Sequence, residues 1–187
     1  SIDNGALTVM INSGEVNGIP GHANKYLLTD VLKTQWGFSG FSVSDWEDLI
    51  KLHSEHLTDS TLKQAIATAI NAGVDMSMVP LSPNYKQYCN LFIELVNEGV
   101  ISMNRLDDAV RRILRVKYHL NLFDKPYNKL DNYNQFASAE FRNKAYKSAT
   151  ESITLLKNNG VLPLSKNKKV LVVGPTSNSL ILARTWS

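Results

Sequence analysis

The chain is poor in cysteine and in clustered charge, and both shortages exclude functions. Cys89 is the only cysteine among 187 residues, so neither an intrachain disulfide nor a cysteine-based metal site can form. The formal net charge is +3, and no run of like charges is longer than Lys168–Lys169. We therefore do not expect nucleic acid or an anionic membrane as a partner, because both require a concentrated basic surface.

Sequence motifs of several other functional classes are also missing. The apolar run Ala6–Ile11 is too short to span a membrane, which takes about 20 apolar residues. Gly174-Pro175-Thr176 is not a glycine-rich phosphate loop, and no G-x-S-x-G motif marks a serine nucleophile. His53 and His56 lack a suitably placed acid, so we expect neither a metal ion nor a cofactor.

What the chain does contain is a repeated alternation of strands and helices. Apolar runs predict strands at residues 6–12, 40–44 and 74–79, helical spacing predicts helices at 24–36, 60–72, 84–97 and 103–120, and residues 48–60 read as a polar loop. Repeated βα units imply parallel strands covered by helices, so the predicted fold class is α/β. A doubly wound sheet and part of a (β/α)8 barrel both fit this order.

The composition changes after the last of these helices. Residues 122–137 are polar and read as a linker that separates a first domain, 1–121, from the start of a second, 138–187. In the second domain a helix is predicted over 138–157, and the apolar run Val170–Val173 predicts a buried strand. The chain begins at Ser1 and ends after this strand without a closing element, so we expect it to be a piece of a longer protein.

The most informative stretch is Phe41–Trp46, a short apolar strand that ends in an acid and an indole. Parallel barrels place catalytic groups at the carboxyl ends of their strands. Asp45 could instead cap a helix, but the sequence shows no clear helix start in the residues that follow it. As a carboxylate it could attack a substrate or transfer a proton, and Trp46 could stack on a sugar ring. Glycoside hydrolysis is the leading reaction that uses carboxylates without a metal.

A set of longer stretches extends this pattern over nearly the whole chain. They are Val9–Pro20, Ala23–Leu32, Trp36–Gly40, Val43–Trp46, Ala72–Met76, Arg105–Leu114, Ser152–Asn158 and Leu162–Leu164. Together they resemble glycoside hydrolase family 3, and most closely its β-glucosidase branch; the Ser44-Asp45-Trp46 block is the most specific part. The resemblance implies the C-terminal portion of a (β/α)8 TIM-like barrel, with its last three strands, followed by the opening of an α/β sandwich domain.

The same resemblance implies roles for four residues. It makes Asp45 the catalytic nucleophile and places Trp46 and Met10 in the sugar site. Where the family often has a tyrosine three residues after that methionine, this chain has Ser13, which we expect to alter the orientation of Asp45 and the sugar preference. The acid/base glutamate of the branch belongs further along the second domain, so it is not expected among these residues.

The implied function is retaining, exo-acting hydrolysis of terminal β-D-glucosyl residues from β-glucosides or oligosaccharides, through a covalent glycosyl-enzyme intermediate. A β-xylosidase of the same family and a non-catalytic carbohydrate-binding member remain as alternatives, and Ser13 is the only sequence support for the latter. The resemblance suggests a periplasmic or secreted protein. We expect these residues alone to be inactive and poorly folded, because three strands leave an open sheet edge.

Overall fold

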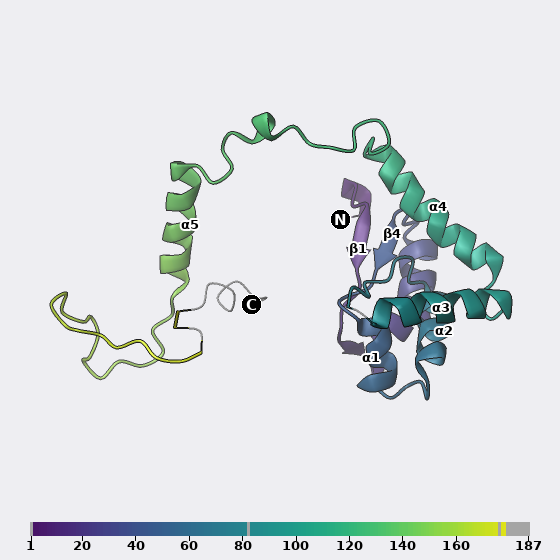
Figure 1. The fold of residues 1–187 in the computed structure, drawn as a ribbon, viewed down its shortest axis with the longest axis horizontal. Coiled ribbons are helices and arrows are strands. Elements are labelled where there is room, and N and C mark those ends of the chain that lie inside the picture. Colours follow the sequence, from purple (N-terminus) through teal and green to yellow (C-terminus); the bar gives the residue numbers. More distant parts are fainter. Residues whose placement is uncertain (1, 82, 176, 179–187) are drawn as a thin grey trace. The chain divides into compact units, whose positions relative to one another are not determined.

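The computed structural model describes residues 2–81, 83–175 and 177–178. The chain divides into two compact units, Ser1–Asn128 and Lys129–Ser187 (Figure 1). The division between the two units falls inside the segment 122–137 that the sequence marks as polar and linker-like.

The β layer of the first unit is built around strand β4 (Phe41–Val43). Strand β1 (Thr8–Met10) pairs with it in parallel, with Thr8 opposite Phe41 and Met10 opposite Val43. The other edge of β4 faces the segment after Gly73: the amides of Ser44 and Met76 donate to the carbonyls of Met76 and Ser42, at 2.9 and 3.0 Å. The central place of β4 fixes where its carboxyl end, and hence Asp45, lies.

The strand predicted over 74–79 is reduced to one parallel bridge, between Val43 and Met76, so that prediction is wrong in extent. The backbone of Met78 is engaged elsewhere. Its N–H donates to the Ser44 hydroxyl at 2.7 Å, and its carbonyl accepts the Glu47 N–H at 2.9 Å. Because these partners take the groups that a longer strand would have used, the ladder stops after Met76.

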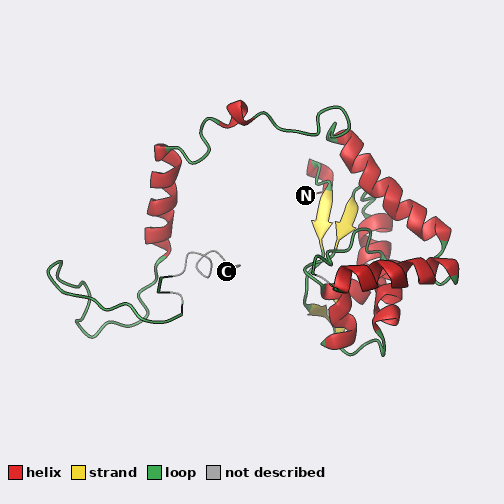
Figure 2. Ribbon diagram, viewed as in Figure 1, coloured by secondary structure: helices red, strands yellow, loops and turns green. Residues whose placement is uncertain are grey.

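Helices cover this β layer (Figure 2). They are the π-helix η3 (Tyr26–Gln35), α1 (Asp48–Ser54), α2 (Leu62–Ala72), α3 (Asn84–Asn97) and α4 (Met103–His119). The helices predicted near 24–36, 60–72, 84–97 and 103–120 are thereby confirmed. Side-chain caps explain three of the starts: Asn24 accepts from the Leu27 N–H, Thr61 forms a capping box with Gln64, and Ser102 accepts from the Arg105 N–H.

Short elements complete the first unit. The 3-10 helix η1 (Ile2–Asn4) precedes β1. Strands β2 (Glu15–Val16) and β3 (Ile19–Pro20) form a small antiparallel hairpin after β1, and the 3-10 helix η2 (Gly21–Ala23) follows them. At Gly21 an added Cβ would lie 2.5 Å from the Asn12 carbonyl oxygen, so only glycine lets the chain fold back this closely.

Helix α1 contradicts the polar loop predicted over 48–60. Leu49 and Leu52 are completely buried, and both belong to the core cluster that includes Ala65 and Ile66 of α2. Two leucines three residues apart supply the apolar face of a two-turn helix. The polar residues that surround them made the stretch look unstructured in the sequence.

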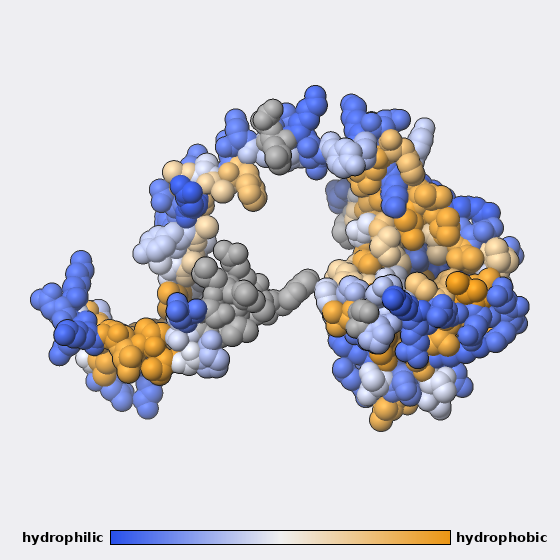
Figure 3. All heavy atoms as spheres, viewed as in Figure 1, coloured by the Kyte–Doolittle hydropathy of each residue, from blue (hydrophilic) through white to orange (hydrophobic). Residues whose placement is uncertain are grey.

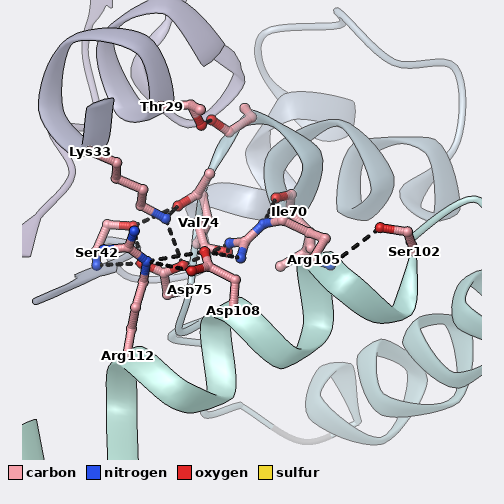
Figure 4. A network of polar contacts seen from close by, with 12 residues as sticks. Thr29, Lys33, Ser42, Ile70, Val74, Asp75, Ser102, Arg105, Asp108 and Arg112 are labelled. Atoms are coloured by element: carbon pink, nitrogen blue, oxygen red, sulfur yellow. Dashed lines mark hydrogen bonds and ion pairs between the residues drawn. The ribbon is translucent and has the colours of Figure 1, made fainter. Parts of the chain in front are cut away.

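A buried ionic network fixes the segment between α2 and Met76 (Figure 4). One oxygen of Asp75 is 2.7 Å from the Lys33 ammonium and 2.8 Å from the Arg105 guanidinium. Its other oxygen accepts the backbone N–H and the hydroxyl of Ser42, at 2.9 and 3.1 Å. Arg105 also donates to the carbonyls of Ile70 and Val74. The network therefore joins η3, β4 and α4.

The second unit contains a 3-10 turn, η4 (Leu130–Tyr133), and helix α5 (Ala139–Ser152), whose N-cap Ser138 accepts from the Phe141 N–H. This confirms a helix from 138, although it ends five residues before the predicted end. The predicted strand at Val170–Val173 is not formed, and Leu171 is 85% exposed. A strand needs a hydrogen-bonding neighbour, and none exists among the described residues of this unit.

The surface of the described residues mixes polar and apolar side chains (Figure 3). None of the described helices has the length and apolar character needed to cross a membrane.

Candidate active site

Asp45 lies two residues beyond the carboxyl end of β4. The residue before it, Ser44, is fully buried; its hydroxyl donates to the Asp45 carbonyl at 2.9 Å and accepts the Met78 N–H at 2.7 Å. These two bonds hold the turn that carries Asp45 out of the sheet. The loop after β1, which also ends on this side of the parallel pair, approaches the same place.

The Asp45 carboxylate has one neutral donor on each oxygen. The backbone N–H of Trp46 donates to Oδ1 at 2.6 Å, and the Ser13 hydroxyl donates to Oδ2 at 3.0 Å. These two hydrogen bonds, the Trp46 amide first, lower the pKa of Asp45 below its ordinary value. The group is therefore ionised at neutral pH, and its partners carry no charge that would neutralise it.

As expected, Asp45 does not cap a helix, but the expectation that no helix starts soon after it is wrong. A helix does begin shortly after Asp45, at Asp48. Its N-cap position is Glu47, which adopts a left-handed backbone (φ 56°) and gives no side-chain cap. The Asp45 carboxylate instead accepts from Trp46 and Ser13, so its oxygens serve the loops around the strand end.

The two other acids in this stretch have structural partners. The Glu47 carboxylate accepts from the side-chain amide of Asn84 in α3, at 3.2 and 3.3 Å. Asp48 is 2% exposed, and its Oδ1 lies 2.6 Å from the Lys51 ammonium. Asp45 is therefore the one of the three whose carboxylate is both partly exposed and held by the neighbouring loop. Among the described residues no three His, Cys, Asp or Glu side chains are grouped as metal ligands.

The other residues expected in the sugar site lie around Asp45 to different degrees. Ser13 contacts its carboxylate directly. Trp46 is the next residue in the chain and is 41% exposed. Met10 is the last residue of β1, opposite Val43, and is 53% exposed. The structure thus brings Ser13 into contact with Asp45. Met10 lies at the end of the neighbouring strand, opposite Val43, which is two residues before Asp45.

The sequence did not single out His22, whose ring contacts the backbone nitrogen of Asp45. Its Nε2 is 3.2 Å from the Asp45 backbone nitrogen, and its Nδ1 is 3.6 Å from the Asp48 carboxylate. His22 is 2% exposed, and burial, the largest influence, lowers its pKa. Its place just after Pro20-Gly21, where the chain must fold back toward β1, was the available signal.

The profile of the Glycosyl hydrolase family 3 N terminal domain matches residues 1–116 of this chain. The chain belongs to glycosyl hydrolase family 3. The family match covers β1, β4, the helices up to α3 and most of α4, including the segment that carries Asp45.

Named relatives within the family are glucosidases and xylosidases. The chain is 44% identical over 181 residues to the lysosomal beta glucosidase of Dictyostelium discoideum, covering 94% of this chain and 22% of that protein. It is 38% identical to the periplasmic beta-glucosidase of Salmonella typhimurium, covering 95% and 23%. A putative beta-xylosidase of Formosa agariphila is 36% identical, with 90% and 22% covered. The chain thus spans less than a quarter of these relatives.

A solved family structure is similar in fold as well as in sequence. The b-glucosidase EmGH1 of Erythrobacter marinus superimposes with a TM-score of 0.69 at 36% identity. The match covers 87% of this chain and 21% of that structure.

Proposed function

We propose that this chain is part of a retaining, exo-acting β-glucosidase in which Asp45 is the nucleophile. One observation carries the proposal: a partly exposed carboxylate stands at the carboxyl end of a parallel strand and is kept ionised by two neutral donors. A nucleophile must be charged and must also keep an electron pair accessible. In this proposal β1, β4 and the Met76 segment belong to the C-terminal portion of a (β/α)8 barrel.

The proposed reaction has two steps. The Asp45 carboxylate attacks the anomeric carbon, the bond to the leaving oxygen breaks, and a carboxylic acid outside these residues protonates that oxygen. The resulting glycosyl ester is then attacked by water, which loses a proton to the same group, and Asp45 is released as a carboxylate. The configuration at the anomeric carbon is inverted twice and so retained.

Within this chain the residues around Asp45 orient it and receive the sugar. The Trp46 N–H and the Ser13 hydroxyl fix both carboxylate oxygens, so that the attacking lone pair is preorganised. We assign the exposed indole of Trp46 to stacking on the sugar or the leaving group, and Met10 to the apolar wall beside it.

Ser13 helps to decide between a working enzyme and a non-catalytic family member. It is the only feature that favours a non-catalytic member, yet its hydroxyl donates to Asp45 and supports the orientation of a working nucleophile. A β-xylosidase stays the second candidate, because a β-xylosidase is among the named relatives. Relatives named lysosomal and periplasmic support a protein that works outside the cytosol.

For the domains we propose the barrel portion at 1–121, a linker at 122–137 and the start of the α/β sandwich at 138–187. The division of the two compact units between Asn128 and Lys129 supports the position of the linker.

A slow-reacting 2-fluoro-β-glucoside tests the nucleophile on the full-length protein. We expect a mass increase of one 2-fluoroglucosyl group, located on the peptide that contains Asp45. An Asp45→Asn variant should stay unlabelled. A label on any other residue would overturn the assignment. Comparing kcat/KM for aryl β-glucosides and aryl β-xylosides then separates the two candidate specificities, because the glucoside should be preferred if the first holds.

A further inference from the structure

A buried histidine links the main chain of Asp45 to helix α1. The His22 ring lies between the Asp45 backbone N–H, 3.2 Å from Nε2, and the Asp48 carboxylate, 3.6 Å from Nδ1. His22 and Asp48 are each 2% exposed. Asp48 in turn lies 2.6 Å from Lys51. Contacts therefore connect Lys51 on α1, through Asp48 and His22, to the backbone of the proposed nucleophile.

The geometry fixes which ring nitrogen carries the proton. A backbone amide can only donate, so Nε2 must accept and cannot be protonated. The neutral ring then carries its hydrogen on Nδ1, which faces the negative Asp48 carboxylate. The charged and titratable groups around the ring are Asp45, Asp48, Lys51 and His56, and Lys51 balances the charge of Asp48. If the ring were protonated, Nε2 would also carry a hydrogen, and this N–H would point at the Asp45 N–H with no acceptor between them.

We propose that His22 is a positioning residue for Asp45: it accepts the Asp45 backbone N–H, and the negative Asp48 carboxylate, 3.6 Å from Nδ1, favours the tautomer with its hydrogen on Nδ1. The inference rests on the proposed function. The main chain of Asp45 is then held at both of its polar groups: His22 accepts from its N–H, and the Ser44 hydroxyl donates to its carbonyl. With the main chain fixed, the side chain has few directions left, and a shift of about 1 Å at a reacting group can cost about 100-fold in rate.

The chain offers a matched control. His56, which follows α1, also pairs with an acid from the β2–β3 hairpin, at 2.9 Å from Glu15. This pair joins the β2–β3 hairpin to the residues after α1, whereas His22 and Asp48 join η2 to α1; it is partly exposed, and neither of its side chains hydrogen-bonds to Asp45. Replacing His56 therefore disturbs the connection between hairpin and helix without touching the main chain of the nucleophile.

The test uses the full-length protein and the 2-fluoro-β-glucoside, with labelling rate and inhibitor affinity measured separately. His22→Leu keeps the ring volume but not the acceptor, and should slow labelling about tenfold or more while the affinity changes less than about twofold. His22→Gln extends an amide oxygen to the place of Nε2 and should restore most of the rate. His22→Asn is equally polar but too short, and should stay slow. His56→Gln should match the wild type.

The outcomes separate this inference from the proposed function. Labelling of His22→Leu at the wild-type rate, or of His22→Gln as slowly as of His22→Leu, would overturn the positioning role and leave the nucleophile assignment intact. Should His22→Leu not fold, the Gln and Asn variants decide the question by the same comparison. If the wild-type protein is not labelled at all, the proposed function fails. Hydrogen exchange of the Asp45 peptide, which His22→Asn should accelerate and His22→Gln should not, then tests the contact alone.

Discussion

Asp45 and Asp75 lie on neighbouring segments of the same β layer, and their surroundings are opposite. Asp75 has a completely buried side chain between two cations, Lys33 and Arg105. Asp45 is partly exposed, and the donors to its carboxylate among the described residues are neutral, the Trp46 amide and the Ser13 hydroxyl. Both carboxylates are well provided with partners, but the first set neutralises the charge and the second leaves it in place.

This difference separates stability from chemistry. A buried carboxylate needs cations, because an unpaired charge in the interior costs several kcal/mol. A nucleophilic carboxylate needs in addition an accessible electron pair, which the partial exposure of Asp45 provides. Neutral hydrogen bonds keep Asp45 ionised and oriented without that penalty. We therefore expect substitutions at the two sites to have effects that do not overlap.

The largest effect is expected for Asp45→Asn. Removing the nucleophile should lower kcat on an aryl β-glucoside by about 10⁴-fold, because the covalent step is lost. The melting temperature should change little, since the amide is isosteric and the site is partly exposed. Turnover and thermal unfolding of the full-length protein check both halves. Loss of folding together with activity would contradict the separation between Asp45 and Asp75.

Asp75→Asn should show the reverse pattern. It removes the counter-charge of the buried Lys33 and one of the two acids that pair with Arg105, and should destabilise the protein by about 3–5 kcal/mol. Chemical denaturation of the full-length protein measures this. Asp107→Asn is the control, because its pair with Arg111 on α4 is exposed and contributes little. An unfolding midpoint equal to that of the control would show that the network is dispensable.

Trp46→Ala tests the sugar contact beside Asp45. The substitution keeps the backbone N–H that binds the carboxylate, so kcat should fall less than KM rises. We expect KM for an aryl β-glucoside to rise about tenfold, from loss of stacking area. Trp36→Ala is the matched control, since Trp36 is also exposed but follows helix η3 rather than strand β4. Equal KM changes in both variants would rule out the assignment of Trp46.

Ser13→Ala should give the smallest effect and a change in pH dependence. The loss of one hydrogen bond should reduce labelling at neutral pH by about 2–10-fold. Because the Ser13 hydroxyl lowers the pKa of Asp45, its removal raises that pKa, and the acidic limit of labelling moves to higher pH. The pH profile of 2-fluoro-glucoside labelling measures this. Ser54→Ala, on the outside of α1, should leave the profile unchanged.

The sequence predicted most of the helices and the position of Asp45, because local signals specify both. Helix α2 has its capping box and its buried stripe within the twelve residues 61–72, and α4 has its N-cap in Ser102. The polar loop over 48–60 was wrong because α1 depends on Leu49 and Leu52 packing on α2, a contact that no local pattern shows. The strand at 170–173 did not form because it has no hydrogen-bonding partner among the described residues, and the strand at 74–79 kept only its bridge to Val43 because the Met78 backbone bonds to Ser44 and Glu47 instead.

By itself the sequence determined the α/β class, the helix boundaries set by caps, and the acid at the end of β4. The tertiary structure decided what surrounds that acid. Ser13 is 32 residues from Asp45 in the chain and His22 is 23, yet they bind its carboxylate and its main chain. Such partners come from loops whose approach depends on the packing of β1 against β4 and of η2 against α1. The chemistry of Asp45 therefore rests on distant contacts, although its position can be found from a six-residue stretch.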